Sequence, residues 1–189
     1  ASDIKLLIPN VKEAAGIVPT ASTTSQLALG DALCIATMKY KKFGKLDFKK
    51  LHPAGSLGAQ LKTVEDIMLT GSKIPFVNEH IKTQKALKIL SQKKLGILVV
   101  RNKKRKTTGI ITDGQIRRSS QKNLNFQSLQ VKEIMTKNPI FVDKNVLAAK
   151  ALTLMNNKKI TSLLVSSKKK PTVTIGVIHV HNILLSNIT

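Results

Sequence analysis

The chain has 189 residues, of which 42% are hydrophobic and 3% aromatic, so its core must be built mainly from Ile, Leu, Val and Ala. Its formal charge of +22 would suit a polyanion, but most of the basic residues are Lys. Specific nucleic-acid recognition favours arginine forks and stacking rings, so we expect no specific nucleic-acid partner. No apolar run approaches the roughly 18–20 residues that span a bilayer, and no signal-peptide pattern is present. We therefore expect no membrane partner. Because Cys34 is the single cysteine, no internal disulfide can form, and we expect a cytoplasmic protein.

The first 61 residues contain only a few predicted elements. Ile4 to Ile8 is a short apolar run that suits a buried strand of an α/β sheet. A polar turn at 19–24 offers hydroxyls that can cap a helix, and Leu27 to Tyr40 is predicted to be a helix with one buried face, with Cys34 in the core. Phe43 to Leu51 is predicted to be a basic loop or a short helix. These elements alone cannot close a core, so we expect this region to need more protein.

The rest of the chain contains an internal duplication with a period of about 65 residues. Each copy is predicted to run from a leading turn through a helix, a strand, a turn and a second strand to a closing helix. Two such copies can cover each other's apolar faces, and Ser119 to Gln130, rich in polar residues, is expected to link them. The matching segments are 64–68 with 131–135, 85–87 with 150–152, 95–100 with 160–165, and 109–116 with 176–183.

This duplicated arrangement resembles the cystathionine-β-synthase-type (CBS) domain pair. The V-x-x-I-M leading segment and the G-[IV]-[IV] strand each occur twice, and the resemblance covers about residues 63–189. It implies a first CBS domain at 63–120 and a second at 128–189. It also implies clefts between the copies that hold a nucleotide or nucleotide sugar as an effector.

The residues expected to hold a ribose depart from the CBS pattern. A carboxylate in the final motif of nucleotide-binding CBS pairs holds the ribose diol, whereas this chain has the amides Gln115 and Asn182. An amide cannot make two charge-assisted bonds to a diol, which favours a module that only packs and oligomerises. If a ligand does bind, the candidate contacts are Thr112, Arg117, Arg118 and Ser162, with the arginines placed for a phosphate. No cofactor and no metal site are expected.

The string Leu-His-Pro-Ala-Gly-Ser-Leu-Gly at 51–58 places a histidine before a proline and two glycines, which predicts a rigid loop. It resembles a motif of the arabinose-5-phosphate isomerases, and the similarity extends over the whole chain. The other segments that carry this resemblance are 11–15, 19–24, 29–33 and 112–118. These enzymes join a sugar-isomerase (SIS) α/β domain to a CBS pair. They interconvert D-arabinose 5-phosphate and D-ribulose 5-phosphate, which supplies the precursor of the Kdo sugar of lipopolysaccharide.

The resemblance implies a fold class and two site residues. The expected fold is α/β: residues 1–61 would be the C-terminal part of a SIS-type parallel α/β domain, followed by the tandem CBS pair as an α+β region. Glu13 and His52 match active-site positions of the family. Aldose–ketose isomerisation needs an acid and a base, so Glu13 is expected to act on the substrate carbons and His52 at the oxygens. The family also implies a homo-oligomer, a tetramer, with a sugar phosphate as substrate.

The first half of a SIS domain, with its Ser/Gly phosphate-binding loop, has no counterpart in this sequence. We therefore expect a fragment or truncated form that is inactive alone. The alternative is a stand-alone CBS-pair module that senses a ligand or regulates a partner, with residues 1–61 as a vestigial arm.

Overall fold

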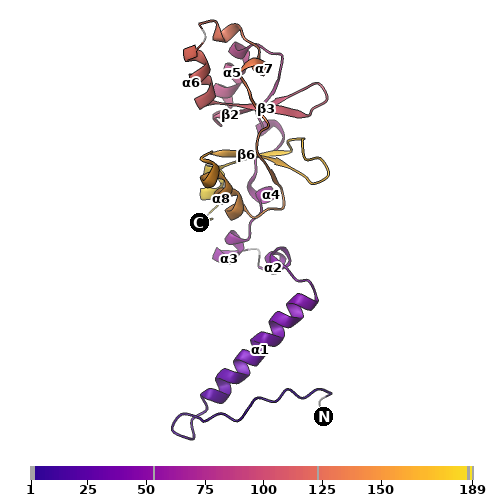
Figure 1. Ribbon diagram of the computed structural model, residues 1–189, viewed down its shortest axis with the longest axis vertical. Coiled ribbons are helices and arrows are strands. Elements are labelled where there is room, and N and C mark those ends of the chain that lie inside the picture. The colour runs from indigo at the N-terminus through magenta and orange to yellow at the C-terminus, as the bar shows by residue number, and fades with distance from the viewer. Residues whose placement is uncertain (1–2, 53, 123, 187, 189) are drawn as a thin grey trace. The chain divides into compact units, whose positions relative to one another are not determined.

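The computed structural model describes residues 3–52, 54–122, 124–186 and 188. It divides into two compact units, Ala1–Leu51 (unit 1) and His52–Thr189 (unit 2), which are described separately below. Figure 1 draws both units and labels most of their helices and some of their strands.

The described part of unit 1 contains two helices, α1 (Ala21–Tyr40) and α2 (Lys45–Leu51), as the sequence indicated. The expectation of a buried face on α1 is wrong, because none of its residues is buried and Cys34 is exposed. The expected strand at Ile4 to Ile8 is also absent: residues 5–10 form no helix or strand, and Leu7 is 90% exposed. A strand needs a neighbour to pair its backbone groups, and the described part of unit 1 contains no other strand.

Unit 2 contains the two repeats. The first comprises α4 (Val64–Ile67), η1 (Gly71–Lys73), β1 (Phe76–Asn78), α5 (Thr83–Lys93), β2 (Ile97–Arg101), β3 (Thr107–Thr112) and α6 (Asp113–Lys122). The second comprises α7 (Val131–Ile134), β4 (Thr136–Lys137), β5 (Phe141–Asp143), α8 (Ala148–Lys158), β6 (Ser162–Ser166), β7 (Gly176–His179) and α9 (Val180–Leu184). The helix α3 (Gly55–Gln60) precedes them, and η2 (Phe126–Ser128) lies between them. The predicted order of elements in each copy is confirmed, with the short strands β1, β4 and β5 as additions.

Each repeat builds its own small mixed sheet. In the first sheet the order is β1-β2-β3-β4, and in the second it is β5-β6-β7. In each repeat the short first strand runs parallel to the next strand, which is antiparallel to the third. The strands β2 and β6 are almost wholly buried, because apolar residues occupy both of their faces. The buried residues that pack between the sheets are Ile74, Ile97, Val99, Leu164 and Val177.

The two repeats exchange their leading helices, α4 and α7. Val64 of α4 is fully buried in the cluster that holds Ala151 and Ile178 of the second repeat. Reciprocally, Val131 of α7 is fully buried with Ala86 of the first repeat. Figure 1 shows the exchange by colour: the purple α4 lies beside the yellow-orange α8, and the orange α7 lies beside α5.

A methionine packed against a glycine follows each leading helix. A Cβ added at Gly109 of β3 would lie 2.7 Å from Sδ of Met135, just after α7. A Cβ added at Gly176 of β7 would collide in the same way with Sδ of Met68, just after α4. The repeated V-x-x-I-M and G-[IV]-[IV] segments are therefore the two sides of one contact, made across the repeats.

Two local expectations need correction. Ser119 to Gln130 is not only a linker, because α6 continues to Lys122 and Phe126 is 6% exposed within the core of the first repeat. The string at 51–58 is not a loop throughout: Leu51 ends α2, and α3 begins at Gly55. The helix α3 contains no proline and therefore keeps every backbone N–H, while Pro53 lies outside the described residues.

Candidate functional site

A cleft of about 780 Å³ opens between the two repeats of unit 2. Equivalent residues of both copies line it, so it lies close to the approximate two-fold axis of the pair. The equivalent pairs are Lys94 with Lys159, Leu95 with Ile160, Gly96 with Thr161, and Thr112 with His179. The segment Thr136 to Ile140 adds a third wall, and Leu164 of the buried core lies at its base.

The ends of helices α5 and α8 fix the two lysines of the cleft. Lys94 and Lys159 each adopt a left-handed conformation, with φ of 52° and 53°, as the residue that ends the helix. The N–H of Lys94 donates to Leu90 O at 3.1 Å, and that of Lys159 donates to Asn156 O at 3.1 Å. Such caps turn the chain sharply from helix to strand. Both lysines are therefore exposed residues of the short turns that lead into β2 and β6, and both line the cleft.

The lining of the cleft is cationic. Lys94, Lys159 and Arg118 carry fixed positive charge, and Asp113 is the only acidic residue among the lining residues. Within the described ranges of the chain, none of these three cations forms a salt bridge. Charges that lack an internal partner are available to an anion from solution, so the cleft favours an anionic ligand.

Two histidines at the start of α9 complete one wall. The rings of His179 and His181 are stacked with their centroids 4.9 Å apart, and the His181 N–H donates to His179 Nδ1 at 3.2 Å. Burial, and secondarily the charge of His181, lower the pKa of His179 below its ordinary value. His179 is therefore a neutral ring at pH 7 that accepts through Nδ1 and presents its other nitrogen as a donor.

The cleft brings together three of the four ligand-contact candidates taken from the sequence. Thr112, Arg118 and Ser162 line it, whereas Arg117 is exposed on α6 and is not among the lining residues. The sequence interpretation missed the cations Lys94 and Lys159 and the histidine pair of α9. Alignment of the two repeats could have found the lysines, because each is the residue that directly precedes the matched apolar strand.

The amides Gln115 and Asn182 are both used inside the fold. The Gln115 side chain donates to Ile134 O and accepts from Thr136 Oγ1 at 2.9 Å, so it ties α6 to the segment after α7. Asn182 Oδ1 accepts from the His179 N–H at 3.2 Å and caps α9. Neither residue is among those that line the cleft. The positions expected to hold a ribose thus have structural partners instead.

Glu13 caps a helix in unit 1. Its carboxylate accepts hydrogen bonds from the consecutive backbone N–H groups of residues 20–22, at 2.7, 2.9 and 3.1 Å. The hydrogen bond of the Ser22 side chain, followed by those of the backbone, lowers the pKa of Glu13 to about 2. In this arrangement the carboxylate stabilises the N-terminus of α1 and is a weak base.

His52 is the first residue of unit 2. It is exposed in the short connection between α2 and α3. Glu13 and His52 therefore belong to different units, and their catalytic roles stay predictions.

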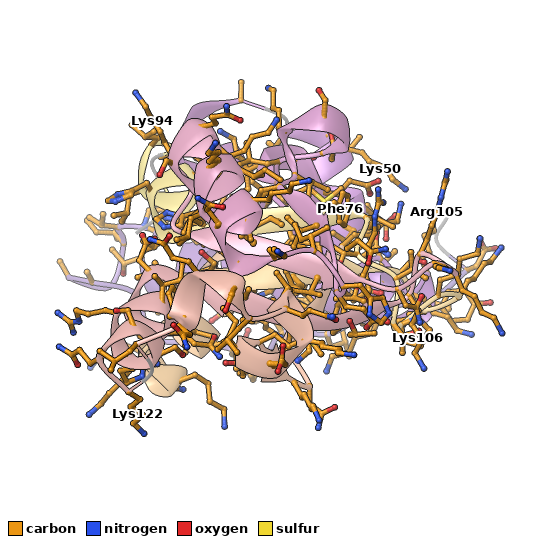
Figure 2. All side chains as sticks on the ribbon, turned by 90° about the horizontal axis from the view of Figure 1, so that it is seen from above. Lys50, Phe76, Lys94, Arg105, Lys106 and Lys122 are labelled. Atoms are coloured by element: carbon orange, nitrogen blue, oxygen red, sulfur yellow. The ribbon has the colours of Figure 1, made fainter. Side chains whose placement is uncertain are left out.

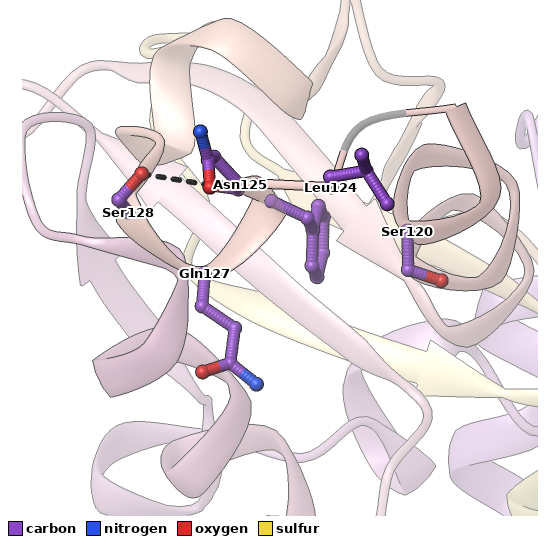
Figure 3. Close-up of a pocket in the computed structure, with 6 residues that line it drawn as sticks. Ser120, Leu124, Asn125, Gln127 and Ser128 are labelled. Carbon is purple, nitrogen blue, oxygen red and sulfur yellow. Dashed lines mark hydrogen bonds between the residues drawn. The ribbon is translucent and has the colours of Figure 1, made fainter.

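A second, smaller hollow of about 360 Å³ lies on the connection between the repeats (Figure 3). It is lined by Ser120 and residues 124–128, and Ser128 Oγ donates to Asn125 O at 2.8 Å within it. No charged residue lines this hollow. Among the described residues, no group of three or more His, Cys, Asp or Glu could hold a metal ion. The cleft between the repeats is therefore the stronger candidate site.

The exchanged leading helices and the shared cleft define a paired-repeat module, and the family follows from its sequence. Residues 64–122 and 131–186 match the CBS domain, so the chain belongs to the CBS-domain family. The CBS protein CBSX2, solved in complex with AMP, superimposes with a TM-score of 0.56 at 23% identity, covering 66% of this chain and 94% of that one. The CBS pair of protein MJ0100 was solved with 5'-methylthioadenosine and S-adenosyl-L-methionine. It superimposes with a TM-score of 0.58 at 22% identity, covering 66% of this chain and 94% of that one. These likenesses confirm the fold.

The whole chain is also related to arabinose 5-phosphate isomerases. It is 39% identical over 191 aligned positions to the arabinose 5-phosphate isomerase KdsD of Salmonella typhi and 37% identical to KdsD of Escherichia coli K12. Each alignment takes in 100% of this chain and 57% of the relative, so the chain spans little more than half the length of these enzymes. In the described part of the chain, no helix is long and apolar enough to cross a membrane.

Proposed function

We propose that this chain belongs to an arabinose 5-phosphate isomerase, in which it supplies two active-site residues and a regulatory CBS pair. The supporting observation is the extent of the similarity. The CBS match is confined to residues 64–186, whereas the similarity to the isomerases also covers unit 1 and the connection that holds His52. A likeness based only on the CBS pair would end at the pair.

The proposed chemistry is the interconversion of an aldose and a ketose phosphate. A proton must move between neighbouring carbons, and an acid must serve the oxygens. We assign the oxygens to His52 and the carbons to Glu13. Because its helix-capping hydrogen bonds hold Glu13 ionised with a pKa of about 2, it must exchange these partners for substrate before it can serve as acid or base.

The chain by itself is expected to be inactive, because its sequence contains no Ser-x-Ser-Gly loop of the kind that would hold the substrate phosphate. The proposed setting is a cytoplasmic homo-oligomer. In it, a nucleotide or nucleotide sugar in the cleft of unit 2 would act as effector. The similar CBS structures were solved with AMP and with two other adenosine-containing compounds, which supports an effector of this kind.

A chimeric enzyme tests the isomerase proposal. The aligned 57% of the Salmonella typhi relative is replaced by this chain, and the conversion of arabinose 5-phosphate to ribulose 5-phosphate is measured. We expect turnover, and a loss of about a hundredfold or more in kcat for Glu13→Gln and for His52→Asn, the range that acid–base groups contribute. Lys12→Gln and Lys49→Gln, on neighbouring positions, are the matched controls and are expected to leave kcat within about twofold.

A second chimera guards against a folding failure. It exchanges only the part that aligns with residues 1–62 and keeps the relative's own CBS pair. A folded chimera of either kind without turnover, or one in which both substitutions are harmless, would overturn the isomerase proposal. That outcome would favour the stand-alone CBS module. One observation favours this second candidate: the cleft and the three apolar clusters that the described residues form lie within unit 2.

A further inference from the structure

The cleft takes its positive charge from equivalent positions of the two repeats and from α6. Lys94 and Lys159 end equivalent helices of the two repeats, and Arg118 adds a guanidinium from α6. The Arg118 Nη1 lies 3.4 Å from where a Cβ of Gly114 would be, so the side chain folds back over the first turn of its own helix. A ligand in the cleft therefore meets cations contributed by both repeats.

Neutral donors lie beside these cations. The hydroxyls of Thr112, Thr161 and Ser162 line the cleft, and within the described ranges none of them has a hydrogen-bond partner. The ring of His179 lies on the same wall. Cations combined with hydroxyl and ring N–H donors match phosphate oxygens, which accept several hydrogen bonds at once.

The features that would recognise a ribose are missing from the same cleft. Gln115 is held by Ile134 O and Thr136 Oγ1, and Asn182 caps α9. Among the described residues, Asp113 is the only carboxylate that lines the cleft, and its Oδ2 lies 3.0 Å from the place of a Cβ on Gly96. Its side chain thus lies over the loop before β2, at the edge of the cleft. No carboxylate remains in the positions that would bind a diol.

We propose that the cleft recognises its effector by phosphate groups and not by a nucleoside. The effectors of this chain are then phosphorylated compounds, and an adenosine moiety adds little to their affinity. This inference rests on the proposed function only in so far as the cleft is taken as the effector site. It departs from what the adenosine-containing ligands of the similar CBS structures suggest. In this chain the positions expected to hold a ribose, Gln115 and Asn182, bond to other parts of the protein instead.

Ligand titration of the full chain by isothermal calorimetry tests the proposal. The probes are pyrophosphate, ribose 5-phosphate, AMP and adenosine, at a fixed moderate salt concentration. We expect the three phosphorylated probes to bind with affinities within about tenfold of one another, and adenosine not to bind. Arg118→Gln and Lys159→Gln should each weaken pyrophosphate binding about tenfold, the effect of losing one charge-assisted hydrogen bond.

Two substitutions of the same charge provide matched controls. Lys122→Gln lies at the other end of α6 from the cleft, and Lys158→Gln precedes Lys159 on α8; neither residue lines the cleft. Figure 2 shows Lys122 reaching out from α6 into solvent. Both controls should keep the affinity for pyrophosphate within about twofold.

Three outcomes would overturn the inference. Adenosine could bind as well as AMP, the controls could weaken binding as much as the cleft variants, or no phosphorylated probe could bind. The second outcome would mean that the net charge of +22 attracts anions without a site. Circular dichroism of each variant establishes that it is folded. The chimera assay does not depend on the cleft, so failure of the isomerase proposal and failure of this one are separate results.

Discussion

Units 1 and 2 are held together differently. The 20-residue helix α1 of unit 1 has no buried residue, and its first turn depends on hydrogen bonds to a single carboxylate, that of Glu13. Unit 2 has shorter helices of at most 11 residues, yet its apolar side chains fill three buried clusters. Local hydrogen bonds maintain the structure of unit 1, and packing between distant segments maintains unit 2.

This contrast means that the same kind of substitution should have different effects in the two units. A change of side-chain volume should matter in unit 2 and be nearly silent in unit 1. A change of local backbone preference or of a capping group should matter most in unit 1.

The largest effect is expected from a cavity at the base of the cleft. Leu164 is 1% exposed between the two sheets, so Leu164→Ala should lower the free energy of unfolding by about 2–5 kcal/mol. Leu33 of α1 is 48% exposed, so Leu33→Ala should change the free energy of unfolding by less than about 0.5 kcal/mol. Urea unfolding followed by circular dichroism measures both. Equal effects would mean that α1 is packed as tightly as β6.

A pair of glycine substitutions should differ in sign. Gly109→Ala places a Cβ 2.7 Å from the Thr136 carbonyl oxygen and should destabilise unit 2 by about 1–3 kcal/mol. Gly30 lies inside α1 with no atom within 4 Å of an added Cβ, so Gly30→Ala should stabilise the helix by about 0.5–1 kcal/mol. Thermal unfolding curves report both changes. A stabilising Gly109→Ala would contradict the methionine–glycine contact between the repeats.

A smaller effect is expected where the two hairpins of unit 2 meet. The Thr107 and Thr174 hydroxyls are 2.7 Å apart and both side chains are buried. Thr107→Val leaves the Thr174 hydroxyl and its N–H without this partner, which should cost about 1–2 kcal/mol of unfolding free energy. The control Thr172→Val, at an exposed position of the same hairpin, should stay within about 0.5 kcal/mol.

The smallest change should appear as a pH dependence of α1. Because the pKa of Glu13 is lowered to about 2, its contribution is complete above its ordinary value of 4.5. The contribution is lost as the pH falls from about 4.5 through 2. Helix content measured by circular dichroism should decline in that pH window, and Glu13→Gln should abolish the part of the decline that comes from this cap. Asp31→Asn, in the middle of α1, should retain it. An unchanged acid profile in Glu13→Gln would exclude the cap as its source.

The repeated sequence predicted the order of the main helices and strands in unit 2, because apolar periodicity is a local property; it missed the short strands β1, β4 and β5. It did not predict that α4 and α7 exchange partners. Periodicity shows which side of Val64 and Val131 is apolar, but both repeats offer an equivalent apolar face. Only the three-dimensional structure distinguishes packing within a copy from packing between copies.

The candidate site was less predictable than the fold. Thr112, Arg118 and Ser162 follow from the CBS motifs, but Lys94 and Lys159 are two among 28 lysines and differ from the others only by their place in the repeat. The prediction of a strand at Ile4 to Ile8 was wrong because it, too, depended on a spatial neighbour. An apolar run predicts a strand only where a partner strand is present, and the run itself does not say whether one is.

The exchange of the leading helices also bears on how the chain matures during synthesis. Val64 leaves the ribosome roughly 120 residues before Ile183, which belongs to the cluster that buries it. At about 5–20 residues per second, the first leading helix stays without its partner for about 6–24 seconds. The apolar side of α4 must therefore stay unpacked on the nascent chain until the second repeat has emerged from the ribosome. A pause in translation between the repeats should accordingly expose it to chaperones.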